Sequence, residues 1–287
     1  MKIGMLVDRV AAEEKLLIKE IESRDVELEL IDVRKMILRL DDPEPWQKYD
    51  VIFDRSVSFS KALATLQILN GWGIPTVNLA RVAEVCGSKL TTSIELERNG
   101  IATPKVSVAY SADSALQAIE EMGYPVVMKP AVGSWGRLLS KINDRDAAET
   151  VLEHKSSLGN YTHSIFYIQQ FIEKAQGKDV RSFVVDGETI CAIDRQSQHW
   201  ITNTARGATT ANCTVSDEID DLSKRAAEAL GGGMLAIDLF EDKQGNWMVN
   251  EVNHSMEFRN SIEPTGVDIP AKMINFVMKA GSHSLVS

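Results

Sequence analysis

The stretch "MLAIDLFEDKQGNWMVNEVN", residues 234–253, decides the fold of this chain. Two apolar segments, 234–240 and 247–253, flank a polar turn at 241–246. Segments arranged in this way pair as antiparallel strands, so the stretch predicts a β-hairpin. Its second strand leads directly into "NHSMEFRN", residues 253–260. So many polar groups after a buried strand indicate that something polar or charged is bound there.

The predicted hairpin gathers oxygen atoms on one face. If the residues that flank the turn are opposed, Asp238 opposes Val249. Because side chains alternate along a strand, Asp238, Glu251 and Asn253 then point the same way. Asp238 and Glu251 become diagonal neighbours, about 7–8 Å apart at Cα. Two carboxylates and an amide oxygen suit Mg²⁺ or Mn²⁺ shared with substrate phosphates. The alternative is a solvated sheet face, and a one-residue bulge would break this geometry.

The composition excludes several classes of protein. The chain has 287 residues, of which 44% are apolar and 25% are charged, which is typical of a globular protein with two or three domains. A net charge of −10 and a pI of about 5.1 argue against general nucleic-acid binding. No apolar run approaches the roughly 18 residues of a membrane span. We therefore expect neither a nucleic-acid partner nor a membrane.

The cysteines and the first residues favour a cytoplasmic location. The three cysteines are far apart and form no CxxC pair, which argues against a disulfide framework or a zinc site. The opening "MKIGMLVDRV" is interrupted by Asp8 and Arg9 too soon for a signal peptide. We expect it to form the first strand.

The order of predicted elements indicates a mixed α/β and α+β fold. Strands alternate with helices over residues 1–80, which predicts a small open sheet of parallel strands. The rest is α+β with mainly antiparallel strands, including a helix at 86–100 and a hairpin that turns at Asp186-Gly187. The expected domains are an N-terminal α/β domain at 1–86, a central subdomain at 87–168 and a C-terminal subdomain at 169–287.

A metal held by few protein ligands implies a nucleotide, and several groups could bind its phosphates. Lys129 ends an apolar strand before a proline, and Lys89 lies near the start of the helix predicted at 86–100. Glycines in "VGSWGR", residues 132–137, would let backbone N–H groups approach phosphate oxygens. Each signal alone is weak, because a lysine that ends a strand is usually just exposed. A Walker loop and a GxGxxG dinucleotide motif are both rejected on their glycine spacing.

Together these parts resemble the ATP-grasp superfamily: a small α/β domain, a strand–lysine–glycine-loop region, and a hairpin with Asp, Glu and Asn. The resemblance covers the whole chain. It is closest to the RimK-like branch, and within it to the amino-acid–carrier-protein ligases of prokaryotic lysine and arginine biosynthesis, the LysX and ArgX type. The stretches that carry it are "PVVMKPAVGSWGRLLSKI", "HWITNTARGA", "AIDLFE" and "NEVNHSMEFRNSIEPTGVDIP". It implies an ATP-grasp fold in which two α+β subdomains clasp ATP.

The resemblance implies a role for each matching position. The residues expected to bind ATP are Lys89, Lys129, Ser134, Gly136, Gln169, Gln170, Phe171, Ile172, Asp179 and Arg181. Those expected near the transferring phosphoryl group are Arg195, Asn203 and Arg206. The expected metal ligands are Asp238, Glu251 and Asn253, and the amino-acid pocket is expected at Arg259, Asn260, Ser261, Thr265 and Gly266. The usual hinge carboxylate is replaced by Gln169 or Gln170, and either could contact adenine.

The implied enzyme is an ATP-dependent, ADP-forming carboxylate–amine ligase. A carboxylate attacks the γ-phosphorus of ATP to give an acyl phosphate, and an amine then displaces phosphate to form an amide. Two Mg²⁺ ions, with Mn²⁺ as an alternative, would share the negative charge with Arg195. His199 and His254 are tempting general bases, but structural imidazoles are expected.

In this family the carboxylate belongs to the C-terminal glutamate of a small acidic carrier protein, called LysW. The amine comes from glutamate or α-aminoadipate, and "SIEPTG" at 261–266 favours glutamate and hence arginine biosynthesis. We also expect a rigid turn at this segment, a homo-oligomer, and a basic patch for the carrier at Arg34, Lys35 and Arg39 or at Lys61. The alternatives are a RimK-like glutamate ligase with another acceptor and a non-catalytic ATP-binding scaffold.

Overall fold

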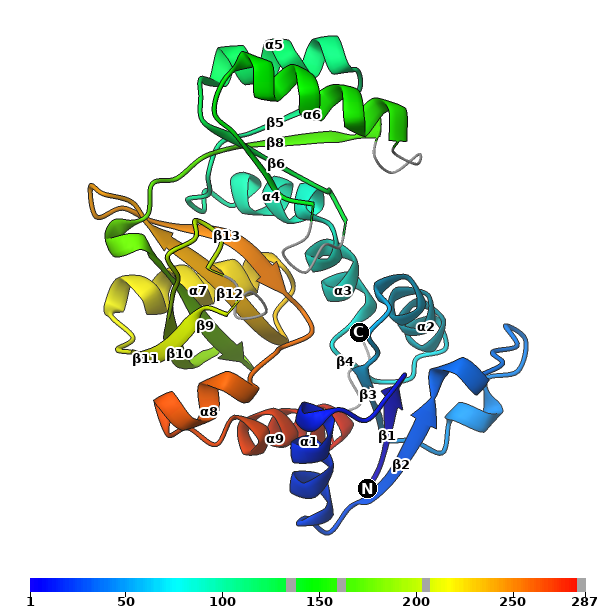
Figure 1. Ribbon diagram of the computed structural model, residues 1–287. Coiled ribbons are helices and arrows are strands. Elements are labelled where there is room, and N and C mark those ends of the chain that lie inside the picture. The colour runs from blue at the N-terminus through cyan, green and yellow to red at the C-terminus, as the bar shows by residue number, and fades with distance from the viewer. Residues whose placement is uncertain (133–137, 159–163, 203–206, 283–287) are drawn as a thin grey trace.

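The structure is a computed structural model that describes residues 1–132, 138–158, 164–202 and 207–282. These residues form three sheets (Figure 1). The N-terminal sheet and a small antiparallel sheet lie at opposite ends of the molecule, and the five-stranded sheet lies beside the segment that links them. Within these ranges no helix is both long and apolar enough to cross a membrane.

The N-terminal sheet is open and parallel, as predicted. Its strand order is β2-β1-β3-β4, with β1 at Lys2–Val7, β2 at Glu27–Asp32, β3 at Val51–Arg55 and β4 at Thr76–Val77. The helices are α1 (Ala12–Glu22), α2 (Phe59–Gly71) and α3 (Ala80–Gly87), with 3₁₀ turns η1 (Val33–Lys35) and η2 (Glu44–Trp46). Strand β1 is apolar and buried from Ile3 to Val7 because both of its faces are covered. Met5 packs in the cluster that includes α1, and Leu6 packs in the cluster that includes α2.

The central sheet is small and antiparallel. Its order is β5-β8-β6-β7, with β5 at Val106–Ala109, β6 at Val126–Lys129, β7 at Ser140–Ile142 and β8 at Phe166–Gln170. Helix α4 (Lys89–Arg98) leads into it, and α5 (Ala112–Met122) and α6 (Arg145–Leu158) lie together over its outer face (Figure 1). Ala115 and Ile119 of α5 pack with Leu152 of α6 on the strands, which leaves the other face of the sheet for the site.

The third sheet is antiparallel with the order β11-β10-β9-β12-β13. Its strands are β9 (Lys178–Val185), β10 (Glu188–Gln196), β11 (Thr209–Cys213), β12 (Met234–Glu241) and β13 (Trp247–Asn253). The remaining elements are the 3₁₀ turn η4 (Ala175–Gly177) and helices α7 (Asp217–Ala229), α8 (Arg259–Thr265) and α9 (Ile269–Ser282). The hairpin predicted around Asp186-Gly187 is confirmed, with the turn between β9 and β10.

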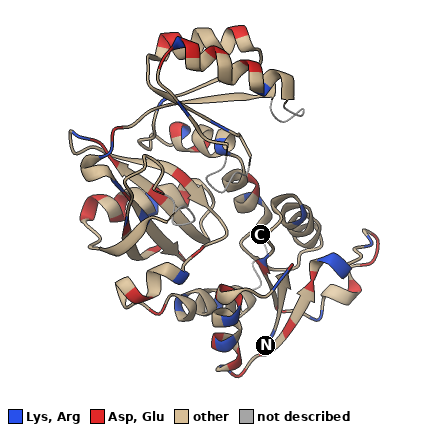
Figure 2. Cartoon of the chain, viewed as in Figure 1, with Lys and Arg blue, Asp and Glu red and all other residues tan. Residues whose placement is uncertain are grey.

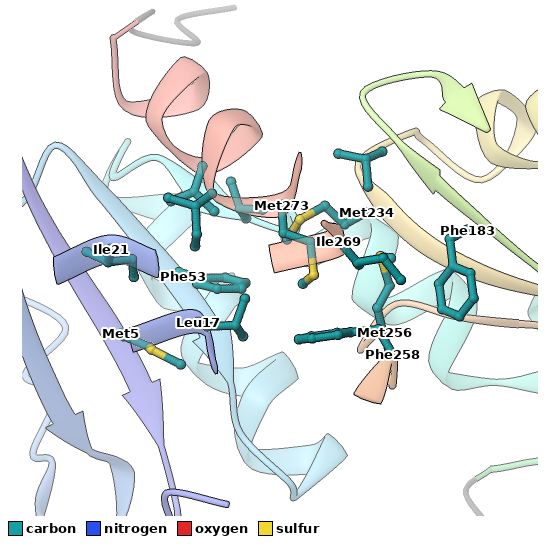
Figure 3. Close-up of a cluster of buried hydrophobic side chains, with 14 of the residues drawn as sticks. Met5, Leu17, Ile21, Phe53, Phe183, Met234, Met256, Phe258, Ile269 and Met273 are labelled. Carbon is teal, nitrogen blue, oxygen red and sulfur yellow. The ribbon is translucent and has the colours of Figure 1, made fainter. Parts of the chain in front are cut away.

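One apolar core joins the N-terminal sheet to the third sheet. Figure 3 shows Met5 and Phe53 on one side, Phe183 on the other, and Met234 and Met256 between them. Helix α9 packs on α1 and contributes to the same core. Asn78 bridges the two parts as well: its Nδ2 donates to the carbonyl oxygens of Met234 (2.8 Å) and His254 (2.7 Å). The end of β13 is therefore fixed against the N-terminal domain.

The structure corrects two predicted elements. The helix predicted at 86–100 begins at Lys89, because Ser88 is extended and its Oγ accepts a hydrogen bond from the N–H of Thr91. Strand β11 and helices α3 and α8 were not predicted. The turn predicted at "SIEPTG" is wrong, because residues 261–265 continue α8 and Gly266 ends it in the left-handed conformation with φ of 66°; the rigidity of the segment stays a prediction. The domain boundaries after residues 86 and 168 stay predictions.

Helix α8 contains Pro264, which explains why it was read as a turn. Proline has no N–H to donate to the carbonyl oxygen four residues earlier. That oxygen, on Asn260, instead accepts a hydrogen bond from Thr210 Oγ1 of β11 at 3.2 Å. Strand β11 therefore supplies the hydrogen bond to this carbonyl oxygen that Pro264 cannot donate.

Candidate active site

The hairpin of β12 and β13 contains a bulge that changes its register. Asp238 pairs directly with Glu251 rather than with Val249, and the register shifts between Asp238 and Leu239. The prediction that the two carboxylates are diagonal neighbours is therefore wrong. Val249 and Val252 both pack in the core under α7, which residues three apart can do only if an extra residue intervenes.

The bulge brings more polar side chains of β13 to the candidate site. It turns Asn250 and Glu251 toward the central sheet, where Asn250 Oδ1 and Glu251 Oε1 meet two lysines. Asn253 pairs with Ala236, two residues before Asp238 on β12, so it stays on the face of Asp238 and Glu251. The shared face predicted for the three oxygen-bearing residues is thus retained.

Lys129 and Lys89 come from different elements and meet at the hairpin. Lys129 ends β6, is only 7% exposed, and donates from Nζ to Asn250 Oδ1 at 2.9 Å. Lys89 begins α4, and its Nζ lies 3.1 Å from Glu251 Oε1. The N–H of Lys89 donates to the carbonyl of Ala131 at 2.8 Å, which fixes the start of α4 against the end of β6. The exposed alternative for Lys129 is therefore wrong.

Lys129 is poised to bind an anion. Burial lowers its pKa to about 8, against the opposing attraction of Glu251, and the charge of Lys89 lowers it further. Its ammonium group donates a hydrogen bond to the neutral amide of Asn250 rather than to a carboxylate. A phosphate oxygen arriving here would supply the negative charge that a buried ammonium group favours.

Asp238 is the centre of a buried ion network. Arg181 Nε and Nη2 contact its two oxygens at 2.7 and 3.0 Å, and Arg195 Nη2 lies 3.0 Å from Oδ2. Arg195 Nε also donates to Asp179 Oδ1 at 2.7 Å. Burial would raise the pKa of Asp238, but the two guanidinium groups outweigh it and hold the pKa at about 2. Asp238 therefore remains a carboxylate at any physiological pH.

A cavity lies between the central and the third sheets and combines apolar with charged walls. Its apolar lining comprises Val127, Leu139, Phe171, Ile172, Trp200, Ile201 and Phe240. Its polar lining comprises Lys129, Gln169, Gln170, Lys174, Asp179, Arg195, Thr202, Asp238, Asn250 and Glu251. Such a lining suits a ligand with a flat apolar part and a polyanionic part, as a nucleoside triphosphate has.

The hinge residues lie where a base could be held. Phe171 packs edge-on against Trp200 with ring centroids 6.3 Å apart, and Lys141 Nζ lies 3.9 Å from the Phe171 ring centre. Gln169 is 2% exposed and its Nε2 reaches Asn250 Oδ1 at 3.5 Å, whereas Gln170 is exposed and its Oε1 accepts from the N–H of Lys105. Both glutamines line the cavity, so the choice between them stays open.

Sequence reasoning missed Lys174. It follows the hinge, its side chain is 8% exposed, and it donates from Nζ to the carbonyl of Trp200 at 3.0 Å and to Thr202 Oγ1 at 2.8 Å. Thr202 Oγ1 in turn contacts Asp179 Oδ2. Lys174 thus fixes the segment after β10 against the cavity. In the sequence it looks like any surface lysine between Glu173 and Ala175, and no motif distinguishes it.

The other expected site residues fall into two groups. Ser134, Gly136, Asn203 and Arg206 lie outside the described residues. Arg259, Asn260, Ser261 and Thr265 belong to α8 and Gly266 follows it; α8 packs on β10 and β11, and these five residues do not line the cavity among the described part of the chain. Their role in amino-acid binding stays a prediction.

The two histidines have structural surroundings. His199 Nδ1 accepts a hydrogen bond from the N–H of Ile201 at 3.0 Å. His254 packs edge-on against Phe59, and burial together with the charge of Arg55 lowers its pKa to about 4. A neutral imidazole at this position fits the structural role expected for it.

The donor set fits a divalent cation shared with phosphates. Asp238 and Glu251 oppose each other on adjacent strands and Asn253 follows on the same face, so all the expected ligands are oxygen atoms. Across the described residues no three His, Cys, Asp or Glu side chains gather closely enough to hold an ion by themselves. An ion held here would therefore need ligands from the substrate, as Mg²⁺ has in nucleotide sites.

Comparison with known proteins identifies this arrangement. Residues 87–277 match the RimK-like ATP-grasp domain, and residues 3–85 match the LysX preATP-grasp domain. The chain belongs to the RimK-like ATP-grasp family. The predicted ATP-grasp fold and the predicted class of ATP-dependent carboxylate–amine ligase are thereby confirmed. ATP-grasp ligases in general use ATP with divalent metal ions.

Individual relatives cover nearly the whole chain. The chain is 32% identical to the glutamate–LysW ligase ArgX of Sulfurisphaera tokodaii, over 96% of this chain and 98% of that one. It is 35% identical to the α-aminoadipate–LysW ligase LysX of Sulfolobus acidocaldarius, over 79% and 82%. The crystal structure of a RimK domain ATP-grasp protein from Sphaerobacter thermophilus superposes with a TM-score of 0.82 at 27% identity, over 97% of this chain and 100% of that one.

Proposed function

We propose that this protein joins an amino acid to the C-terminal glutamate of a LysW-like carrier, with glutamate as the amino acid and arginine biosynthesis as the pathway. The observation that carries the proposal is the cavity lined by basic side chains and by the paired carboxylates Asp238 and Glu251. The chain's relatives are named LysW ligases. The proposed product is an amide between the carrier's terminal side-chain carboxylate and the α-amino group.

The residues divide the work of phosphoryl transfer. Lys89 and Lys129 bind the phosphates of ATP from the central side, and Arg195 neutralises charge that develops on the transferring group from the sheet side. The hinge around Gln169 and Phe171 holds the base. Asp238, Glu251 and Asn253 would hold Mg²⁺, as two ions and with Mn²⁺ as an alternative, and the metal would supply Lewis-acid stabilisation. Lys174 keeps the segment before Asn203 in place.

α-Aminoadipate is the alternative amino acid, because relatives with either specificity are similarly identical to this chain. The two substrates differ by one methylene group, which a pocket discriminates by only about 1–3 kcal/mol. We keep glutamate on the strength of "SIEPTG" at 261–266. A homo-oligomer and a cytoplasmic location also remain predictions.

A second candidate is glutamate ligation to a different acceptor. The tetrahydromethanopterin:α-L-glutamate ligase of Methanocaldococcus jannaschii is 27% identical over 97% of this chain. The same cavity would serve either acceptor, since phosphoryl transfer to a carboxylate is common to both.

Carrier-dependent ADP release separates the candidates. We expect ADP release with ATP, Mg²⁺, carrier and glutamate, and a kcat/KM for glutamate at least several-fold above that for α-aminoadipate. Carrier that lacks its terminal glutamate is the matched control and should give background release only. Equal release with the truncated carrier would contradict the carrier as acceptor and favour another one.

A further inference from the structure

The backbone on both sides of Glu257 is held by hydrogen bonds with Arg55 and Glu13, which together form a clamp. Its neighbours Met256 and Phe258 are 1% and 0% exposed, and Figure 3 shows both side chains in the core between the N-terminal and third sheets. Arg55 Nη1 donates to the carbonyl of Met256 at 3.1 Å. Glu13 Oε1 accepts from the N–H groups of Phe258 (2.7 Å) and Arg259 (2.8 Å).

The clamp is itself rigid. The Arg55 side chain is 5% exposed and lies 3.3 Å from Glu13 and 3.1 Å from Glu14, both at the start of α1. A buried arginine with two carboxylates and a carbonyl oxygen has little freedom to move. Hydrogen bonds with the N-terminal domain thus fix the backbone of residues 256–259, which follow β13. Glu257 lies within this fixed segment.

The Glu257 side chain points out of this frame toward the site. It is 43% exposed, and Oε2 lies 4.0 Å from Nη1 of Arg181. The other nitrogens of that guanidinium group, Nε and Nη2, hold Asp238, which lines the cavity. Glu257 therefore lies one guanidinium group away from Asp238 and the expected phosphoryl-transfer centre.

Stability does not account for this placement. An ion pair at 4.0 Å with a half-exposed carboxylate contributes about 1 kcal/mol at most, and Arg181 is already satisfied by Asp238. Burial raises the pKa of Glu257, Arg181 and Arg55 oppose the rise, and Glu13 and Asp238 add to it. A carboxyl group in these surroundings can both attract a cation and hold a proton.

We propose that Glu257 binds the α-ammonium group of the incoming amino acid and takes one of its protons as the amine attacks the acyl phosphate. The inference rests on the proposed function. The ammonium group gives one proton to the Glu257 carboxylate, and the neutral nitrogen forms a bond to the acyl carbon. The carbon–oxygen bond to phosphate then breaks, phosphate leaves with the electron pair and accepts the second proton, and Glu257 returns its proton to solvent.

Hydroxylamine separates this role from phosphoryl transfer. It is neutral at pH 7 and attacks acyl phosphates without a base, so ADP release and carrier hydroxamate report the first half-reaction alone. In Glu257→Gln we expect hydroxamate formation within about threefold of the parent and kcat/KM for the amino acid lowered by roughly 10²-fold or more. Glu257→Asp should recover part of that loss, because it keeps the charge.

The matched control is Glu153→Gln, the same change at an exposed position on α6. It should leave both reactions unchanged. A pH profile gives an independent readout: kcat/KM for the amino acid should fall on the acid side as Glu257 becomes protonated, and Glu257→Gln should lack that limb. The charged groups that face Glu257 are Arg181, Arg55, Glu13 and Asp238, none of which is altered by the substitution.

Two results would overturn the proposal. Equal losses of hydroxamate and amide formation in Glu257→Gln would show that the residue only positions Arg181, and no loss in either would show that it has no role. Parent enzyme that makes hydroxamate but no amide would contradict the proposed amino acids, and parent enzyme that makes neither would contradict the proposed function itself.

Discussion

At the scale of single residues, burial distinguishes the lysines and carboxylates of the candidate site from those on the protein surface. Lys129 looks exposed in the sequence because it ends a strand, yet β6 pairs with β8 and carries it into the cavity wall. Lys174 has no sequence signal because its partners, Trp200 and Thr202, lie beyond a whole hairpin. Local sequence cannot reveal contacts made through such long connections.

Lys129→Ala should weaken ATP binding by roughly 1.5–3 kcal/mol, the value of a desolvated charge-assisted hydrogen bond. Because burial lowers the pKa of Lys129 to about 8, its charged fraction falls as pH rises through that value, and ATP affinity should fall with it. Lys129→Arg should bind with little change over the same range. Calorimetry checks both, and unchanged affinity in Lys129→Ala would remove Lys129 from the phosphate site.

Asp238→Asn and Glu251→Gln should both abolish ligation but differ in stability. Asp238 compensates two buried guanidinium groups, so its neutralisation should cost roughly 3 kcal/mol or more of unfolding free energy. Glu251 is partly exposed and pairs with Lys89, so Glu251→Gln should change the melting temperature little. Thermal unfolding with an activity assay tests the pair, and near-normal turnover in excess Mg²⁺ would contradict the metal assignment.

At the scale of elements, alternation of side chains predicts a strand but not its irregularities. The parallel N-terminal sheet, the β9–β10 hairpin and the β12–β13 hairpin were all predictable from apolar runs and turns. The bulge at Asn250 was not, because a polar residue in a strand looks the same whether it is paired or extra. Helix α8 was missed since Pro264 signals a break, and the hydrogen bond from Thr210 of β11 to the carbonyl of Asn260 compensates for the missing N–H.

Helix α8 provides a test of amino-acid choice. Pro264→Gly frees the φ angle that the proline ring fixes, and it should change the ratio of kcat/KM for glutamate and α-aminoadipate by about tenfold, with little effect on ATP affinity. Pro264→Ala is the better helix former at this position, so it should keep α8 formed and retain the parental ratio. If both variants keep the ratio, the side-chain pocket lies in other residues, and the segment from Arg195 to Arg206 should be tested next.

At the scale of the whole molecule, an acidic enzyme must recruit an acidic carrier. Figure 2 shows basic and acidic residues interspersed over all parts of the fold, so attraction depends on local patches. The segment after β2 offers one: Lys35 and Arg39 are exposed beside Ile37 and Leu40, which are 74% and 73% exposed.

Charge reversal of this segment should slow carrier association. The combined change Lys35→Glu and Arg39→Glu should lower the association rate several-fold at low salt and much less at high salt, because screening weakens the contribution. Lys61→Glu on α2 tests the other predicted patch in the same way. Stopped-flow binding measures the rates, and if reversal at both places changes nothing, carrier recognition depends on its tail or on another surface.

The most direct measurement of the central claim is the intact mass of the carrier after incubation with the enzyme, ATP and Mg²⁺, and with glutamate or α-aminoadipate. The proposed function predicts that the carrier gains the mass of one glutamate residue, that ADP forms in equal amount, and that Glu251→Gln produces neither. An unmodified carrier in the presence of active, ATP-binding enzyme would contradict it.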